Sequence, residues 1–230
     1  MSLTNKSTKD KIMELVREAN PDNPTQYVTD IVKNFALEKL NDKIYNCNIC
    51  GCYNQKTYLT GNPDSKILII KDIPNSIQFE NNNSNNCFYF NGYEDKMYQI
   101  FNMLNIDPDV LLYCNCINCL MANNHLPNKQ EISNCYKNIV GSVIETVKPK
   151  AILLFGSVPV KMFFNTTLMT VRGQLLEINS IPTVATYSLS YFDKIKDFKE
   201  QSVIESEYNI FTQDIYNFFD YCINTLNIEL

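Results

Sequence analysis

The sequence predicts an α/β protein: a three-layer α/β/α core around a central four-stranded, mostly parallel sheet, with extra helices at the N- and C-terminal ends. Three observations support this class. Short apolar runs that suit buried parallel strands recur along the chain, most clearly at residues 66–71 and 150–155. Segments with helical periodicity lie between these runs, so strands alternate with helices. Hydrophobic residues make up 45% of the 230 residues, which is enough to bury a sizeable core.

The elements follow in order along the chain. Helices are expected at residues 7–19, 25–40, 93–105, 129–147 and 205–227, with a short helix ending at Phe164. Strands are expected at residues 66–71, 110–113 and 150–155, and as a pair at 174–178 and 182–186. We therefore divide the chain into a helical extension at residues 1–44, an α/β domain at 45–204 and a C-terminal helix packed on the core at 205–230.

Charge and hydropathy exclude two classes of function. The net charge is −5, and Arg17 and Arg172 are the only arginines, so the protein cannot grip nucleic acid by overall charge. No apolar run approaches the roughly 18–20 residues of a membrane span, and the N-terminus lacks the apolar core of a signal peptide. We expect a soluble intracellular protein without membrane contact, in which the nine cysteines stay reduced.

Three short segments follow predicted strands and are the expected places for a ligand. In parallel α/β sheets, ligands bind beyond the carboxyl ends of the strands. The segments are Asp72 to Asn75, Cys114 to Asn118, and Thr186 to Tyr191.

The cysteines offer a candidate metal site. Cys47 and Cys50 are separated by two residues, a spacing that lets two thiolates reach one metal from a tight turn. Further ligands would come from Cys114, Cys116, Cys119 and Cys135. Spacing alone does not distinguish zinc from an iron–sulfur cluster, and scattered cysteines also pack as small hydrophobic residues.

The order of several motifs resembles the iron–sulfur uracil-DNA glycosylases, often called family 4, over about residues 45–192. The likeness is carried by Phe90-Asn91-Gly92, Asn115 to Cys119, Asn123 to Pro127, Glu131-Ile132 with Cys135, Lys148 to Ile152 with Phe155-Gly156, Arg172-Gly173-Gln174, and Ile181 to Val184 with Thr186-Tyr187. The resemblance implies that a [4Fe–4S] cluster is held by Cys47, Cys50, Cys119 and Cys135. A zinc site in an unrelated α/β domain remains the alternative.

The resemblance also implies roles in base excision from DNA. A glycosylase extracts the base from the stack, binds it in a tight pocket and stabilises the charges that develop as the glycosidic bond breaks. The implied set is Phe90, Asn115 and Pro74 for binding the base, Asp72 and Ser188 for catalysis, and His125, Ser190 and Tyr191 for contacting DNA. Asn115 would read the edge of the base because an amide offers both a donor and an acceptor.

Two motifs depart from the family pattern. The family sequence Gly-Glu-Ala-Pro-Gly corresponds here to Lys71 to Asn75, which keeps a carboxylate at Asp72 but loses both glycines. The family sequence His-Pro-Ser/Ala-Tyr corresponds to Ser188 to Tyr191, so a hydroxyl replaces the imidazole that donates to the developing oxyanion.

These departures leave two functions open. The first is a divergent DNA glycosylase acting on uracil or another altered base, with single-stranded or uracil-containing DNA as its partner. The second is a catalytically impaired protein of the same fold that binds DNA or protein as an accessory or structural module, using the terminal helices as protein-binding surfaces.

Overall fold

A computed structural model describes the chain except residues 1–13, 15, 19–21, 52–54, 75–93 and 122–124, together with the side chains of 24–33 and Glu94. The expected helix at residues 7–19 lies mostly outside the described residues.

The centre of the protein is a six-stranded sheet in the order β1-β3-β2-β4-β6-β5. The strands are β1 (Thr60–Gly61), β2 (Ile67–Lys71), β3 (Leu112–Asn115), β4 (Ala151–Phe155), β5 (Leu176–Ile178) and β6 (Ile181–Thr186). The four middle strands are parallel, and β1 and β5 are antiparallel additions at the two edges. The prediction of a four-stranded sheet is therefore wrong in extent, although the parallel centre has four strands.

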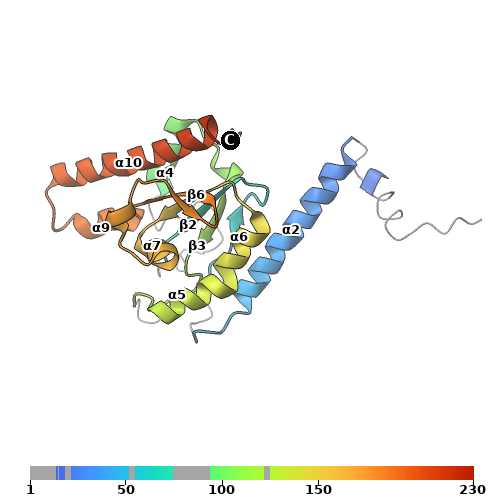
Figure 1. Cartoon of the computed structure of the whole chain (residues 1–230), viewed down its shortest axis with the longest axis horizontal. Helices are drawn as coiled ribbons and strands as arrows, with labels where there is room; N and C mark the ends of the chain where they lie inside the picture. The colour runs from blue at the N-terminus through green and yellow to red at the C-terminus, as the bar shows by residue number, and fades with distance from the viewer. Residues whose placement is uncertain (1–13, 15, 19–21, 52–54, 75–93, 122–124) are drawn as a thin grey trace, which may run out of the picture.

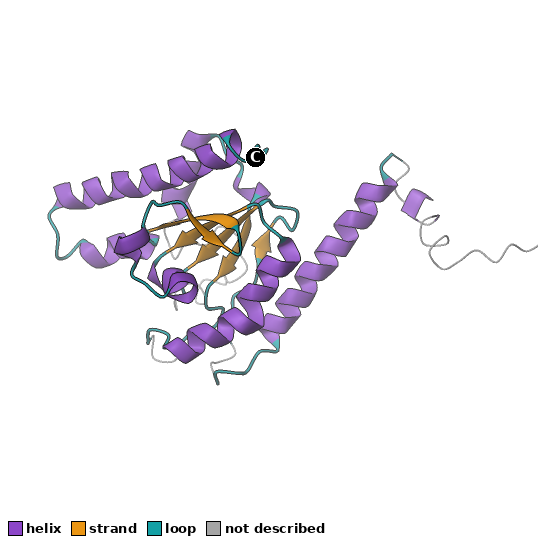
Figure 2. Ribbon diagram, viewed as in Figure 1, coloured by secondary structure: helices purple, strands orange, loops and turns teal. Residues whose placement is uncertain are grey.

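Helices connect the strands and cover both faces of the sheet (Figure 2). The α-helices are α2 (Pro24–Tyr45), α4 (Glu94–Leu104), α5 (Lys129–Cys135), α6 (Gly141–Val147), α7 (Ser157–Phe164), α8 (Leu168–Val171), α9 (Leu189–Ile195) and α10 (Gln201–Asn224). A 3₁₀ turn, η1 (Pro108–Val110), precedes β3, and a π-helical segment, η3 (Tyr136–Val140), joins α5 to α6. The short helices α8 and α9 were not expected from the sequence.

Successive side chains along each strand point to opposite faces of the sheet, so the core has two layers. In β4, Leu153 and Phe155 pack with α4, α9 and α10, whereas Ile152 and Leu154 pack with α2, α5, α6 and α7 on the opposite face. Every residue of β2 and β4 is buried, because helices cover both faces. The expected three-layer α/β/α arrangement is confirmed, and Figure 1 shows α10 on the far side of the sheet from α5 and α6.

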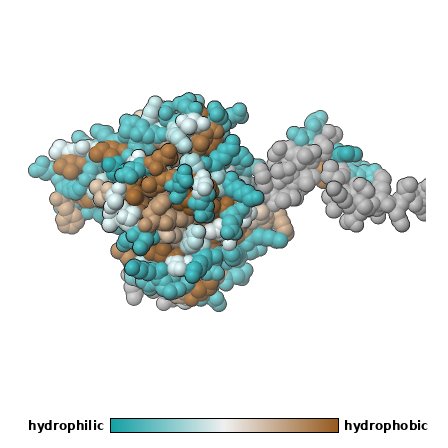
Figure 3. Space-filling model, in the orientation of Figure 1, coloured by the Kyte–Doolittle hydropathy of each residue, from teal (hydrophilic) through white to brown (hydrophobic). Residues whose placement is uncertain are grey.

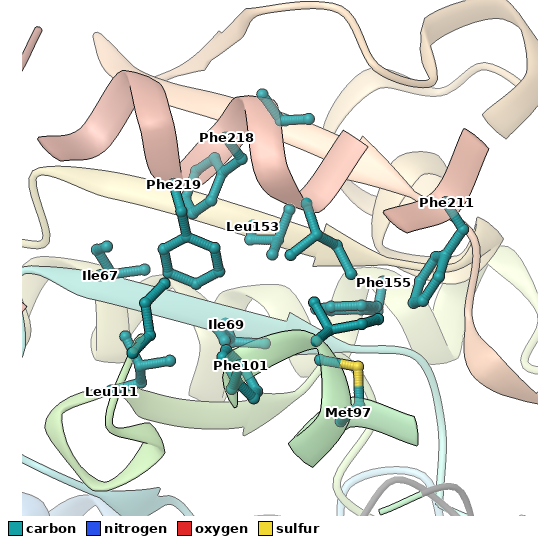
Figure 4. Packing of buried hydrophobic residues seen from close by; sticks show 14 of the residues in the cluster. Ile67, Ile69, Met97, Phe101, Leu111, Leu153, Phe155, Phe211, Phe218 and Phe219 are labelled. Carbon is teal, nitrogen blue, oxygen red and sulfur yellow. The ribbon is translucent and has the colours of Figure 1, made fainter. Parts of the chain in front are cut away.

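Aromatic side chains fix α10 on its face of the sheet (Figure 4). Phe219 meets Phe101 of α4 edge-to-face with ring centroids 5.9 Å apart, and Phe211 meets Phe155 of β4 at 6.1 Å. Such pairs add about 0.5–1.5 kcal/mol each beyond the burial of their surface. The C-terminal helix is therefore an integral part of the core.

Helix α2 contacts α6 and η3 on the other face of the sheet. Its Leu40 and Ile44 are buried in that core layer, while the start of the helix extends beyond the sheet (Figure 1). On the face shown in Figure 3, hydrophobic residues emerge in patches among hydrophilic ones. Within the described residues, no helix is both long and apolar enough to cross a membrane.

Candidate active site and cysteine cavity

The predicted polar residues gather where the four parallel strands end. The amide of Cys116, just after β3, donates to the carbonyl oxygens of Lys71 and Asp72 after β2. Gly156, after β4, packs against the Asp72 carboxylate, and its amide donates to the carbonyl of Thr186 at the end of β6, 2.9 Å away. The carboxyl ends of β3, β2, β4 and β6 thus form one continuous edge, as expected for a ligand site in a parallel sheet.

Asp72 lies at the centre of this edge and is tied to the start of α7. Its Oδ1 accepts a hydrogen bond from the Val158 amide at 3.1 Å. Burial raises the pKa of the Asp72 carboxyl to about 6, against the opposing effects of the Val158 and Ser157 amides and of the Lys194 and Lys161 charges. A carboxyl with a pKa near neutrality is suited to accept a proton during catalysis.

Gly156 makes room for this carboxylate. Its φ is +98°, and a Cβ at this position would overlap the Asp72 side chain. Glycine is the residue that adopts this conformation without strain and leaves the space open.

Asn115, the residue expected to read the base, ends β3 and is only 5% exposed. Its Nδ2 donates to the Thr57 hydroxyl at 2.7 Å, which fixes the orientation of the amide. Lys71 is its register partner on β2 and is 9% exposed. The ammonium of Lys71 stands 6.0 Å from the centroid of the Tyr113 ring.

Ser188 and its neighbours occupy the start of α9. The hydroxyls of Ser188 and Ser190 are 3.0 Å apart. Tyr191 stacks on Tyr187 with centroids 4.5 Å apart, and its hydroxyl donates to Glu207 on α10 at 2.7 Å. Tyr191, predicted to contact DNA, is therefore part of the packing between α9 and α10.

A partly buried ion pair links the end of β6 to α10. Asp214 on α10 accepts hydrogen bonds from Arg172 at 2.7 Å and from the Thr186 hydroxyl at 2.8 Å. The guanidinium of Arg172 also lies 5.3 Å from the Tyr187 ring centroid. The Arg-Gly segment thus holds the end of β6 against α10.

The other predicted site residues have different surroundings. Phe90 lies outside the described residues, and Pro74 is buried directly after the β2 edge. His125, predicted to contact DNA, places its Nε2 3.2 Å from Glu131, which belongs to the capping box at the start of α5. Among the described residues of the predicted set, Asp72, Pro74 and Asn115 therefore lie at or after the ends of β2 and β3, and Ser188, Ser190 and Tyr191 lie at the start of α9.

The four cysteines singled out as ligands line one cavity. Cys47 and Cys50 follow α2, Cys119 follows β3, and Cys135 ends α5. Burial and the neighbouring thiols of Cys119, Cys50 and Cys47 raise the pKa of Cys135 to about 12. Cys114 and Cys116, the other candidates, are buried in the core, and Cys116 contacts Met162.

Polar contacts brace the walls of this cavity. The ammonium of Lys56 donates to the carbonyls of Tyr45 and Cys47, and the Asn134 amide donates to the Cys50 sulfur at 3.4 Å. In the part of the chain that the structure describes, no three His, Cys, Asp or Glu side chains are grouped closely enough to hold a single metal ion. The thiols share a cavity without converging on one point.

Fold and site together define an α/β domain with a polar ligand site at the carboxyl edge of a parallel sheet and a thiol-lined cavity beside its connections. The family model of the uracil DNA glycosylase superfamily matches residues 58–207, well over half of the chain. The protein belongs to this superfamily. No curated protein matches the chain significantly.

Some residues of the site carried no signal in the sequence. Thr57 orients Asn115 from 58 positions away, and the Val158 amide donates to the Asp72 carboxylate from 86 positions away. Both contacts depend on which strands become neighbours in the sheet. Lys71 did carry a signal, since a charged residue stands where the resembling family has glycine.

Proposed function

We propose that the protein is a divergent uracil-DNA glycosylase that hydrolyses the N-glycosidic bond of uracil or another altered base in DNA. The observation that carries the proposal is the placement of Asp72 and Asn115 on one edge, at the carboxyl ends of adjacent parallel strands. The Asn115 amide can hydrogen-bond to the edge of the base, and the Asp72 carboxylate can orient and deprotonate a water molecule near the sugar.

Binding of the base and activation of water are proposed to take place on opposite faces of the sheet at this edge. The Asn115 side chain shares the sheet face of Leu111 and Tyr113, and would bind the flipped base there. Asp72 is turned toward α7, where its carboxylate would orient a water molecule and accept its proton as the bond to C1′ breaks. Ser188 would donate its hydroxyl to the base in place of the family imidazole.

Two lysines near this edge would attract the phosphates of DNA. Lys161 on α7 and Lys194 on α9 are exposed and close enough to lower the pKa of Asp72. Lysines near the site would contact phosphates although the whole chain is acidic, and such contacts position a nucleic acid without reading its sequence. His125 and Ser190 remain proposed contacts to the DNA backbone.

The thiol-lined cavity fits an iron–sulfur cluster. Four thiols from three separate segments surround one space, and a [4Fe–4S] cluster spreads its ligands over four irons, so the sulfurs need not meet at one point. Cys47, Cys50, Cys119 and Cys135 would hold it. A bound cluster would supply a rigid link between the end of α2, the segment after β3 and the end of α5.

The cofactor proposal is tested by anaerobic purification followed by iron and sulfide analysis. We expect a brown protein, and loss of iron in Cys119→Ser and Cys135→Ser. Cys222→Ala, in the opposite core layer, is the matched control and keeps its iron. A colourless protein with stoichiometric zinc would reject the iron–sulfur proposal and support a zinc site.

The enzymatic proposal is tested by base release. Purified protein, at a concentration equal to that of the substrate, is incubated with single-stranded and duplex DNA containing uracil, and abasic sites are then cleaved with alkali. We expect strand cleavage at uracil positions. Absence of product with uracil and with several other altered bases would reject the enzymatic function.

One observation favours the second candidate function, a non-catalytic DNA- or protein-binding module. Asp72 already accepts a hydrogen bond from the Val158 amide and so caps α7, a structural role that requires no catalysis. DNA binding without base release, or stable capture of a protein through α2 or α10, would support this alternative.

A further inference from the structure

Lys71 is a buried cation on the same side of the sheet as the proposed base reader. Lys71 and Asn115 are register partners on β2 and β3. Lys71 continues the alternating face of Ile67 and Ile69, and Asn115 continues that of Leu111 and Tyr113, so the two side chains project from the same face. The amide and the ammonium are therefore neighbours at the carboxyl edge.

Lys71 lies in surroundings from which water is largely excluded. The residue is 9% exposed, and its Nζ lies 6.0 Å from the centroid of the Tyr113 ring, within the range of a cation–π contact. A charge acts more strongly on a ligand where water is largely excluded. The ammonium therefore lies in a largely water-excluded position beside Asn115.

Base excision creates a negative charge at this place. The bond between C1′ and the base nitrogen breaks with its electron pair, which leaves on the base as an anion. Water adds to C1′ and gives its proton to Asp72, and the released base is later protonated by solvent. Ser188, a neutral hydroxyl, supplies no positive charge to that anion.

We propose that the ammonium of Lys71 supplies the positive charge that stabilises the anion of the departing base, beside the hydrogen bond donated by the Ser188 hydroxyl. This inference rests on the proposed base-excision function and names the residue that makes it possible without histidine. Loss of such a preorganised donor costs about 10²–10³ in rate.

The test is single-turnover excision of uracil and of 5-fluorouracil by the wild type, Lys71→Met, Lys71→Gln and Lys71→Arg. Methionine keeps most of the apolar stem and removes the charge. Lys66→Met is the matched control, because Lys66 is an exposed lysine just before the amino end of the same strand. Circular dichroism and thermal unfolding verify that each variant is folded.

We expect the two neutral variants to release uracil about 10²–10³ times more slowly, Lys71→Arg to retain part of the rate and Lys66→Met to retain all of it. The deficit of the neutral variants should shrink with 5-fluorouracil, because fluorine already stabilises the anion. A purely structural role would slow both substrates equally.

Failure of the proposed function and failure of the Lys71 role give different results. A wild type that releases neither base refutes the proposed function and, with it, the role of Lys71. An active wild type whose neutral Lys71 variants are unimpaired, or equally slow on both bases, refutes the role of Lys71 alone.

Discussion

At the scale of single residues, Asp72 has two roles that have to be separated, the capping of α7 and the proposed activation of water. Asparagine can still accept the Val158 amide hydrogen bond but cannot take a proton. Alanine can do neither. Asp72→Asn and Asp72→Ala together therefore separate the role of the carboxylate charge from the capping of α7.

Asp72→Asn is predicted to slow base release by about 10²–10⁴-fold while the free energy of unfolding changes little. In the wild type, the rate should rise with pH and level off above about 6, since the carboxylate is the active form and its pKa is raised to about 6. The measurement is a single-turnover pH profile, in which the bend should vanish in Asp72→Asn. An Asp72→Asn variant as fast as the wild type would show that the carboxylate is only a helix cap.

Gly156→Ala is predicted to destabilise the protein by about 1–3 kcal/mol through its positive φ alone, and further through overlap with the Asp72 carboxylate. Urea unfolding of Gly156→Ala, Asp72→Ala and the double variant separates the two causes. The penalty of Gly156→Ala should be smaller when Asp72 is already alanine. Equal penalties in both backgrounds would mean that the carboxylate does not occupy this space in solution.

Residue types near the strand ends predicted much of the site, but their contacts could not be predicted. Asp72 and Asn115 stand out because polar residues end apolar runs, and the carboxyl-edge rule then places them together. Their partners, Thr57 and the Val158 amide, belong to segments with no distinguishing pattern. The involvement of Tyr191 with Glu207 was equally invisible, because it depends on how α9 packs against α10.

At the scale of elements, the strands with continuous apolar runs were predictable because both faces of the sheet are covered. The helix at residues 93–105 is confirmed as α4, Glu94–Leu104. The two-residue β1 has no apolar run of its own, and its pairing is set by β3. The π-helical segment directly after Cys135 lies within the helix expected at residues 129–147, and helical periodicity did not distinguish it from an α-helix; such segments frequently mark functional sites.

The contact between α10 and β6 gives a prediction at this scale. Asp214→Ala should lower the free energy of unfolding by about 2–4 kcal/mol, because it leaves the largely buried Arg172 guanidinium and the Thr186 hydroxyl without their acceptor. Denaturant unfolding measures the effect. Asp193→Ala, which breaks the exposed pair with Lys196, is the control and should change little. Equal effects of the two variants would refute the anchoring role of Asp214.

At the scale of the whole molecule, the sheet brings distant segments to one edge. The residues that follow β2, β3, β4 and β6 meet there, although they span positions 72 to 188 of the chain. The thiol-lined cavity joins the end of α2 to the connections after β3 and α5, on the face of the sheet opposite α10. One fold therefore supports both the proposed base pocket and the proposed cluster site.

The central claim is that this edge binds a flipped base beside Asn115. The most direct measurement is a crystal structure with DNA containing 2′-fluoro-2′-deoxyuridine, whose glycosidic bond resists cleavage, so that the result does not depend on catalysis. We predict the uracil ring out of the duplex, with its edge hydrogen-bonded to Asn115 and its sugar facing Asp72. DNA bound elsewhere on the molecule, with no base at the ends of β2 and β3, would contradict the account.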